Sequence, residues 1–175
     1  WEWYDGGSSM AVPEADQIVR FSVANAAVLH VTPEEWDAAR EHFGYVGLSM
    51  GSIIGFQSAL SLSLDVFSYF GLFSGFSTYP ANILQNIDKD EFRDLPIHYL
   101  FNAVGQWDVA YYEHSGYYRE LLSKTDRLEE GRNAALVTVK EYGHEFRTWI
   151  VGLYDALQVF FSYTDGTPPD IGTAP

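Results

Sequence analysis

The sequence has 175 residues, with 24 acidic side chains against 10 basic ones and a formal net charge of −14. Its length suits one domain with its own hydrophobic core, and an apolar content of 47% excludes a disordered chain. The acidic balance argues against nucleic acid and anionic membranes as partners, because no basic stripe is present to contact phosphates. The absence of cysteine excludes disulfides, thiolate metal sites and a cysteine nucleophile. No apolar run reaches the roughly 18 residues of a transmembrane helix.

Strand-like and helix-like segments alternate along the chain. The runs that predict buried strands are residues 45–48, 69–73, 97–104 and 134–139. The runs with helical spacing are residues 50–64, 111–122 and 146–161, and the last of these is strongly amphipathic. Four strand-to-helix steps predict an α/β fold with a mainly parallel sheet and flanking helices. In such sheets the functional residues lie at the carboxyl ends of the strands.

The motif Gly47-Leu48-Ser49-Met50-Gly51 lies between the first strand and the first helix and fits G-x-S-x-G. This pattern is typical of a nucleophilic serine on a sharp strand-to-helix turn. We expect Gly47 and Gly51 to remove Cβ atoms that would clash there, so that Ser49 can adopt strained dihedral angles. The Met50 N–H, at the start of the helix, is the candidate donor to a developing oxyanion. A plain turn rich in glycine and serine is the alternative.

A serine nucleophile needs a general base, and three histidines follow Ser49. His144 comes just past the last predicted strand, which places it on a loop at the carboxyl edge, and we expect it to be the base. His98 lies within a strand-like run, so we expect a structural or half-buried residue. His114 lies in a helix-like run, so we expect a surface residue.

The candidate acid is Asp108, which follows the third strand and therefore lies on a loop at the same edge. Its rivals Asp88, Asp90 and Asp94 precede that strand in a stretch that has the composition of a solvated charged face. The spacing of Asp88 and Asp90 lacks the glycine and the closing glutamate of a calcium loop, so no metal site is expected.

Several stretches together form a more specific pattern than the pentapeptide: residues 39–52 around Ser49, 64–75 with a Ser-Gly ending, the acid loop 105–111, the histidine loop 143–149, and residues 154–157 and 160–161 of the last helix. In combination they resemble the esterase-D-like α/β-hydrolases, most closely the feruloyl esterase modules of bacterial xylanases. The resemblance spans roughly residues 39–161, and the chain order of serine, acid and histidine is that of the family.

The resemblance implies a serine carboxylesterase with an α/β-hydrolase fold. Ser49 would be the nucleophile, His144 the general base and acid, and Asp108 the orienting carboxylate. The Met50 N–H would be one oxyanion donor, and Trp107 would line the acyl or sugar site, unless it is a packing aromatic. Hydroxycinnamoyl esters of plant polysaccharide are the implied substrates, with no cofactor and with secretion from the cell.

The sequence departs from the family at two points. Ser52 stands where the family has a second glycine after the serine turn, and only 48 residues precede Ser49. In the family a longer N-terminal half holds the first strands and the loop with the second oxyanion N–H. We therefore expect a poorly matched segment at 1–38, the C-terminal part of a catalytic domain at 39–163, and a linker-like tail at 164–175. A partner chain or second copy would supply the missing strands, unless that half was removed or the protein is a reduced variant. The alternatives are a non-catalytic binding or assembly piece and an acyltransferase.

Overall fold

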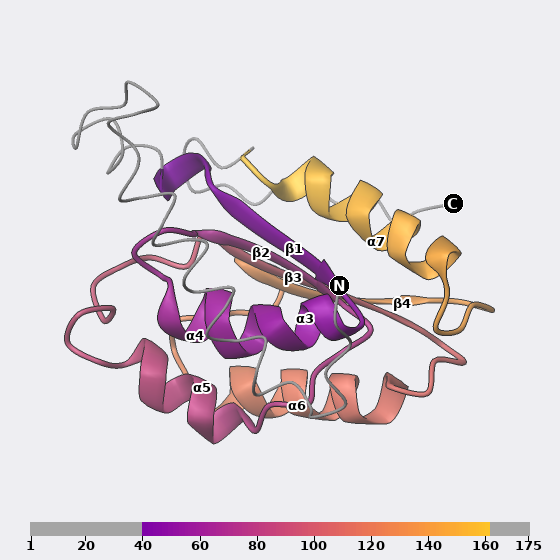
Figure 1. Cartoon of the computed structure of the whole chain (residues 1–175), viewed down its shortest axis with the longest axis horizontal. Helices are drawn as coiled ribbons and strands as arrows, with labels where there is room; N and C mark the ends of the chain where they lie inside the picture. Colours follow the sequence, from indigo (N-terminus) through magenta and orange to yellow (C-terminus); the bar gives the residue numbers. More distant parts are fainter. Residues whose placement is uncertain (1–39, 162–175) are drawn as a thin grey trace, which may run out of the picture.

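Four parallel strands form the centre of the computed structural model, which describes residues 40–161 (Figure 1). The segments 1–38 and 164–175 lie outside the described residues. The strands are paired in chain order: β1 (Gly44–Leu48), β2 (Tyr69–Phe73), β3 (Tyr99–Gly105) and β4 (Ala134–Val139). All four predicted strands are therefore present, with β3 starting two residues later than expected.

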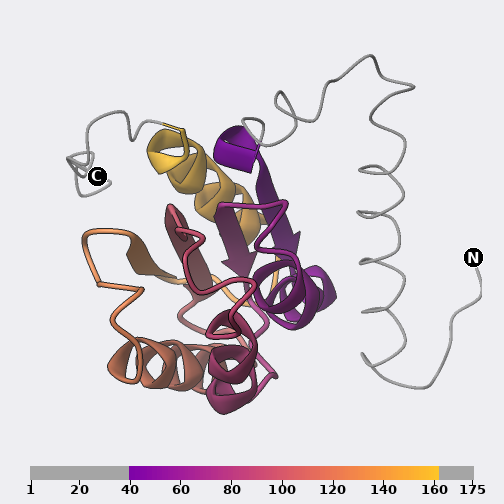
Figure 2. The same ribbon diagram turned by 90° about the vertical axis from the view of Figure 1, so that its left-hand side faces the viewer.

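The helices cover the two faces of the sheet unequally (Figures 1 and 2). The elements α3 (Met50–Ile54), α4 (Leu60–Leu62), α5 (Pro80–Ile87) and α6 (Tyr111–Ser123) lie on one face, whereas α7 (Phe146–Val159) lies on the other. The single helix expected over residues 50–64 contains a π-helical turn, η3 (Gly55–Ala59), and ends at Leu62. The α5 helix was not predicted; it begins at Pro80, a residue favoured at the first helical position.

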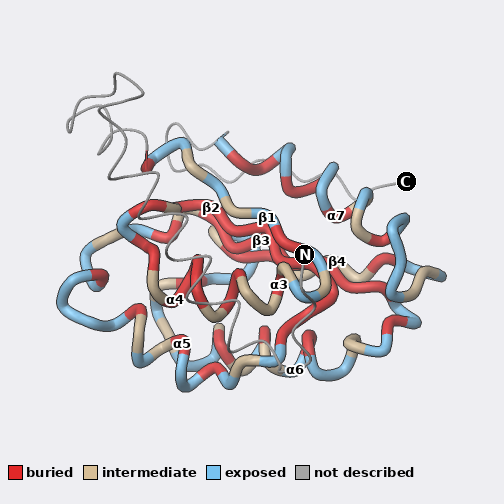
Figure 3. Tube along the Cα trace, in the orientation of Figure 1, coloured by how far each residue is buried: buried red, intermediate tan, exposed pale blue. Residues whose placement is uncertain are grey.

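Each face of the sheet has its own apolar core. The larger core, under α3–α6, contains residues such as Phe56, Leu60, Phe70, Leu72, Phe76, Ile83 and Leu100. The smaller core, under α7, contains Tyr69, Phe73, Tyr99, Phe101, Ala103, Ala135, Ala156, Val159 and Phe160. β2 and β3 are buried along their whole length, which is expected for central parallel strands that are covered on both faces (Figure 3).

The α7 helix approaches the sheet most closely through small residues, and apart from Trp149 and Phe160 the large apolar residues that made its sequence strongly amphipathic face outward. A Cβ added to Gly152 would lie 2.7 Å from the Cβ of Ala103, and the neighbouring Ala156 is fully buried. This close approach turns the opposite side of the helix outward, with the exposed residues Phe146, Ile150, Leu153, Tyr154 and Leu157. An amphipathic helix ordinarily packs its larger apolar side chains on the core. In α7 these exposed side chains point away from the sheet instead, and no element within residues 40–161 covers them.

In the described part of the chain, β1 is an edge strand. Its Val46 and Leu48 lie on the same face of the sheet as α7, because they pair with Gly71 and Phe73 of β2. Val46 and Leu48 are 40% and 41% exposed, because the main contacts of α7 are with β2, β3 and β4. An exposed apolar edge of this kind is a template for pairing with another strand.

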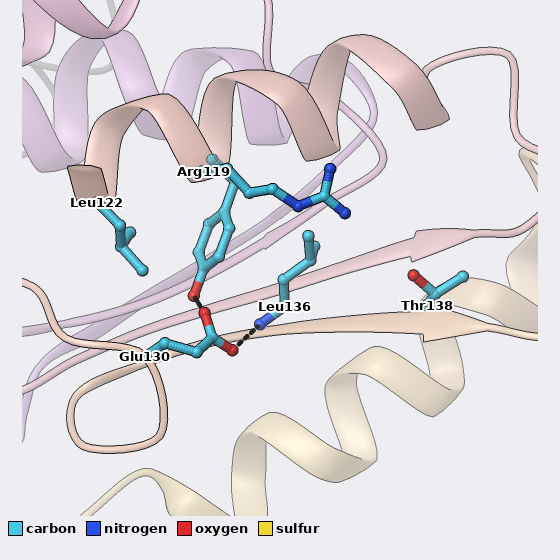
Figure 4. A pocket seen from close by; sticks show the side chains of 6 residues that line it. Arg119, Leu122, Glu130, Leu136 and Thr138 are labelled. Carbon is cyan, nitrogen blue, oxygen red and sulfur yellow. Dashed lines mark hydrogen bonds between the residues drawn. The ribbon is translucent and has the colours of Figure 1, made fainter.

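The other edge, β4, is protected by a side chain. Glu130 accepts hydrogen bonds from the Tyr118 hydroxyl at 2.5 Å and from the Leu136 N–H at 3.4 Å (Figure 4). Burial and the adjacent carboxylate raise the pKa of Tyr118 far above its ordinary range. A hollow of about 400 Å³ opens here between α6 and β4, and Arg119 and Thr138 also line it. No helix within residues 40–161 has the length and apolar character needed to cross a membrane.

Candidate active site

Ser49 lies on a sharp turn between β1 and α3, as the motif predicts. Its dihedral angles are φ 52° and ψ −117°, a strained conformation for a residue with a side chain. The Ser49 N–H donates to the Phe73 carbonyl at 2.8 Å, and the Ser49 carbonyl accepts from the N–H groups of Ser52 and Ile53 at 3.0 and 3.2 Å. Hydrogen bonds at both peptide groups therefore hold the strained residue in place.

Close backbone approaches explain one of the two glycines of the motif. A Cβ at Gly47 would lie 2.3 Å from the carbonyl oxygen of Gly51, which confirms the expected clash. A Cβ at Gly51, in contrast, would meet no atom within 4 Å, so the steric role expected for Gly51 is wrong among the described residues. The second glycine that the turn requires is Gly75, after β2, where a Cβ would lie 2.3 Å from the Ser49 carbonyl oxygen.

The loops that follow β3 and β4 are joined at the carboxyl edge of the sheet. The Trp107 N–H donates to the Tyr142 carbonyl at 2.9 Å, and a Cβ at Gly105 would lie 2.5 Å from the same oxygen. Thr148 at the start of α7 donates its hydroxyl to the Gly143 carbonyl at 2.7 Å. These contacts fix the two loops against each other and bring the predicted acid and the predicted base together.

Asp108, His144 and Ser49 form a continuous chain of hydrogen bonds, although Ser49 and His144 are 95 residues apart in the sequence. The Nδ1 atom of His144 lies 3.0 and 3.2 Å from the two carboxylate oxygens of Asp108. The Nε2 atom of His144 lies 2.8 Å from the Ser49 Oγ. The structure therefore places all three predicted residues within reach of one another, in the arrangement of nucleophile, base and orienting acid.

The surroundings keep this chain of hydrogen bonds in one geometry. The Asp108 side chain is 0% exposed, and its Oδ1 also accepts the Ala110 N–H at 2.8 Å. On its other side, the His144 ring packs edge-to-face against Trp149 of α7, with the ring centroids 5.2 Å apart. Trp149 entered the sequence argument as the last residue of the histidine loop and as a residue of the amphipathic helix, with no contact to His144 assigned to it. Its contact with the His144 ring depends on which side of α7 faces the loops, and the sequence pattern did not identify that side.

Two further predicted residues lie at the same edge. Met50 is the first residue of α3, so its N–H is one of the helix donors without an intrahelical acceptor. Met50 directly follows Ser49 in the sequence. Trp107 is 68% exposed, which argues against a packing role and leaves its indole ring accessible beside the acid loop. Both positions are compatible with the roles that the resemblance implies.

The rival histidines and aspartates are separate from this site. His98 is half-buried and pairs with Glu41 at the opposite end of the sheet, before β3 begins. The surface position expected for His114 is wrong, because its side chain is buried beneath the serine turn. The three alternative aspartates are exposed residues of the segment that links α5 to β3: Asp88, Asp90 and Asp94. Within residues 40–161, no group of three metal-binding side chains is close enough to hold an ion.

The solved structures that are similar to this chain include the following two. One is described as a structure of FAE, and it matches with a TM-score of 0.64 and 23% identity over 77% of this chain and 50% of that one. The other is a serine-to-alanine mutant of the feruloyl esterase module from Clostridium thermocellum, complexed with sinapinate. It matches with a TM-score of 0.64 and 22% identity over the same shares. No protein-family model and no curated protein matches the chain.

These similarities establish the fold. The parallel sheet, its flanking helices and the neighbouring structures identify an α/β-hydrolase fold of the kind found in esterases, as the sequence predicted. The chain spans half the length of each of the two neighbours.

Proposed function

We propose that this chain carries the catalytic groups of a serine carboxylesterase that resembles feruloyl esterases. The observation on which the proposal rests is the hydrogen-bonded series of Asp108, His144 and Ser49 at the carboxyl edge of the sheet. The similarity to two esterase structures in fold is consistent with it. By the same resemblance, the proposed substrates are hydroxycinnamoyl esters of plant cell-wall polysaccharide. Because such polymers do not enter cells, we also propose that the enzyme works outside the cell.

The geometry supports acyl transfer through a covalent intermediate. The Ser49 Oγ attacks the ester carbonyl carbon while its proton passes to the Nε2 of His144, and the imidazolium that forms donates through Nδ1 to Asp108. The Met50 N–H binds the carbonyl oxygen as it becomes negative. Collapse of the tetrahedral intermediate breaks the ester C–O bond, and the leaving alkoxide takes the proton from Nε2. Water then cleaves the acyl-enzyme by the same steps in reverse, with His144 as the base.

Substitution of the nucleophile tests the proposal. We expect Ser49→Ala to lower kcat for 4-nitrophenyl acetate by about 10⁴-fold or more, because the three groups act as a unit. A fluorophosphonate probe should label the wild type at Ser49 and should not label the variant. Ser123→Ala, which removes an exposed hydroxyl on α6, is the matched control and should retain full activity. Full retention of hydrolysis by Ser49→Ala would refute the esterase proposal.

The exposed β1 edge motivates a second proposal about partners. We propose that a further polypeptide, either another chain or a second copy, pairs with β1 and covers the outward side of α7. Val46 and Leu48 remain exposed without it, and the similar structures are twice as long as the part that this chain matches. Native mass spectrometry of the purified protein should find a complex, and Val46→Lys should weaken it. A monomer at micromolar concentration would contradict this proposal.

Two alternatives remain open to experiment. If no fluorophosphonate reaction occurs in the intact complex, a non-catalytic assembly piece on an α/β-hydrolase scaffold is the better account. If the acyl-enzyme forms but passes its acyl group to an added sugar in preference to water, the protein is an acyltransferase. Comparing the products with and without the sugar acceptor separates hydrolysis from transfer.

A further inference from the structure

His114 is a buried polar residue that the proposed reaction does not use. Its side chain is 0% exposed, and both ring nitrogens have partners. Nδ1 accepts the Gly75 N–H at 3.1 Å, and Nε2 lies 3.1 Å from the Asn102 Oδ1. A backbone N–H can only donate, so Nδ1 carries no proton and Nε2–H donates to the amide oxygen. The ring is therefore neutral and held in one tautomer. Burial lowers the pKa of His114 to about 4, although the charge of Asp108 opposes this shift.

The partner of His114 is in direct contact with the serine turn. The Gly75 carbonyl accepts the Ser52 hydroxyl at 2.6 Å, so hydrogen bonds hold this residue on both sides. There is no room for a Cβ at Gly75, because it would lie 2.3 Å from the Ser49 carbonyl oxygen. Two residues before Gly75, the Phe73 carbonyl accepts the Ser49 N–H at 2.8 Å. The loop after β2 therefore presses against the nucleophile from a fixed position.

Packing alone does not require a histidine at this position. The ring lies edge-to-face against Phe56 and Phe76, with centroid distances of 6.1 and 5.8 Å, and a phenylalanine would occupy similar space. A phenylalanine would leave the buried Gly75 N–H without an acceptor, which is costly in an apolar interior. The feature that distinguishes His114 is therefore its hydrogen bond to the loop that contacts Ser49.

We infer that His114 is a positioning residue for the nucleophile, acting on Ser49 through Gly75. This inference rests on the proposed esterase function. α6 anchors the ring, the ring fixes the Gly75 N–H, and Gly75 confines the strained Ser49 backbone. Release of Gly75 would let the Ser49 Oγ shift relative to the Nε2 of His144. A misplacement of about 1 Å costs about 10²-fold in rate, so a modest movement of the loop has a large effect.

A pair of variants separates this role from a purely structural one. In His114→Asn, the amide oxygen falls near the position of Nδ1 and can still accept the Gly75 N–H. In His114→Gln, the amide nitrogen falls near Nε2, which keeps the bond to Asn102 but loses the acceptor for Gly75. We expect His114→Asn to retain most of the wild-type kcat. We expect His114→Gln to lose about 10²-fold in kcat with little change in KM.

The measurements are kcat and KM for 4-nitrophenyl acetate per active site, the fluorophosphonate labelling rate, and the melting temperature. His98→Gln, outside the site, is the control and should leave all of them near the wild-type values. Equal rates for His114→Gln and the wild type, or equal losses in both His114 variants, would overturn the inference. Absence of labelling in the wild type would instead overturn the esterase proposal and this inference with it.

A measurement on the wild type covers the case in which the variants do not fold. Nitrogen NMR should find the His114 ring neutral with its proton on Nε2. Reaction of Ser49 with the fluorophosphonate should shift the Gly75 amide and His114 ring resonances. Unchanged resonances at both residues would overturn the proposed connection.

Discussion

Replacement of the acid by its amide tests whether the carboxylate of Asp108 sets the protonation of His144. Asp108 Oδ1 accepts both the Ala110 N–H at 2.8 Å and the His144 Nδ1–H at 3.0 Å. In Asp108→Asn the Ala110 N–H will hold the amide oxygen at that position, so the amide NH₂ will replace Oδ2, 3.2 Å from Nδ1. The amide nitrogen there donates to an unprotonated Nδ1 and so competes with the amide oxygen, which stays 3.0 Å from Nδ1. This competition favours the tautomer with the proton on Nε2, which leaves Ser49 without a base, and the neutral amide no longer stabilises the imidazolium charge.

The expected loss in kcat is about 10⁴-fold, or roughly 5 kcal/mol of transition-state stabilisation, because the wrong tautomer has no lone pair for the serine proton. The assay is hydrolysis of 4-nitrophenyl acetate, with circular dichroism to verify folding. Asp90→Asn is the matched control, since Asp90 contributes only an exposed ion pair with Arg93, and it should keep full activity. A folded Asp108→Asn protein with a rate within about tenfold of the wild type would refute this role for the carboxylate.

Two further predictions concern stability. Gly47→Ala should destabilise and inactivate the protein, because its Cβ would lie 2.3 Å from the Gly51 oxygen. At Gly116 on α6, an added Cβ would meet no atom within 4 Å. Gly116→Ala should therefore raise the free energy of unfolding, measured in urea, by about 0.5–1 kcal/mol. If Gly47→Ala were more stable than Gly116→Ala, these steric expectations would be contradicted. His114 has a folded pKa of about 4, below the unfolded value of 6.5, so its contribution to stability is complete above pH 6.5 and is lost as the pH falls towards 4. As the pH falls between these values, the free energy of unfolding of the wild type should decrease by up to about 1.4 kcal/mol per pH unit more than that of His114→Asn. Equal slopes of unfolding free energy against pH for the two proteins would show that burial does not disfavour the charged ring.

The strands and the three candidate catalytic residues were predictable because each depends on local signals. Short apolar runs separated by glycine, proline and polar residues define buried strands. In a parallel sheet, residues that follow a strand are brought to the same edge, so the positions of Ser49, Asp108 and His144 follow once the strands are identified. Their hydrogen bonds agree with that expectation.

The environment of His114 was not predictable in the same way. Its neighbours along the chain are polar and aromatic, and they indicated a surface residue. The hydrogen-bond partners of its ring are Asn102 on β3 and Gly75 after β2, which reach the ring only when the sheet is assembled. The requirement for Gly75 has the same origin, because the atom that it approaches belongs to Ser49 on another loop.

The sequence alone determined the strand order along the chain, the serine turn and the choice of Ser49, His144 and Asp108 as candidates for nucleophile, base and acid, because backbone propensities and residue spacing act over short distances. Tertiary structure decided which side of α7 meets the sheet. Hydrophobicity marked the large apolar side chains such as Ile150 and Leu157, but the close approach permitted by Gly152 and Ala156 placed the small-residue side on β3 and left Ile150, Leu157 and their neighbours on that side exposed. Steric fit between elements distant in the chain set that orientation, and a linear pattern does not contain this information.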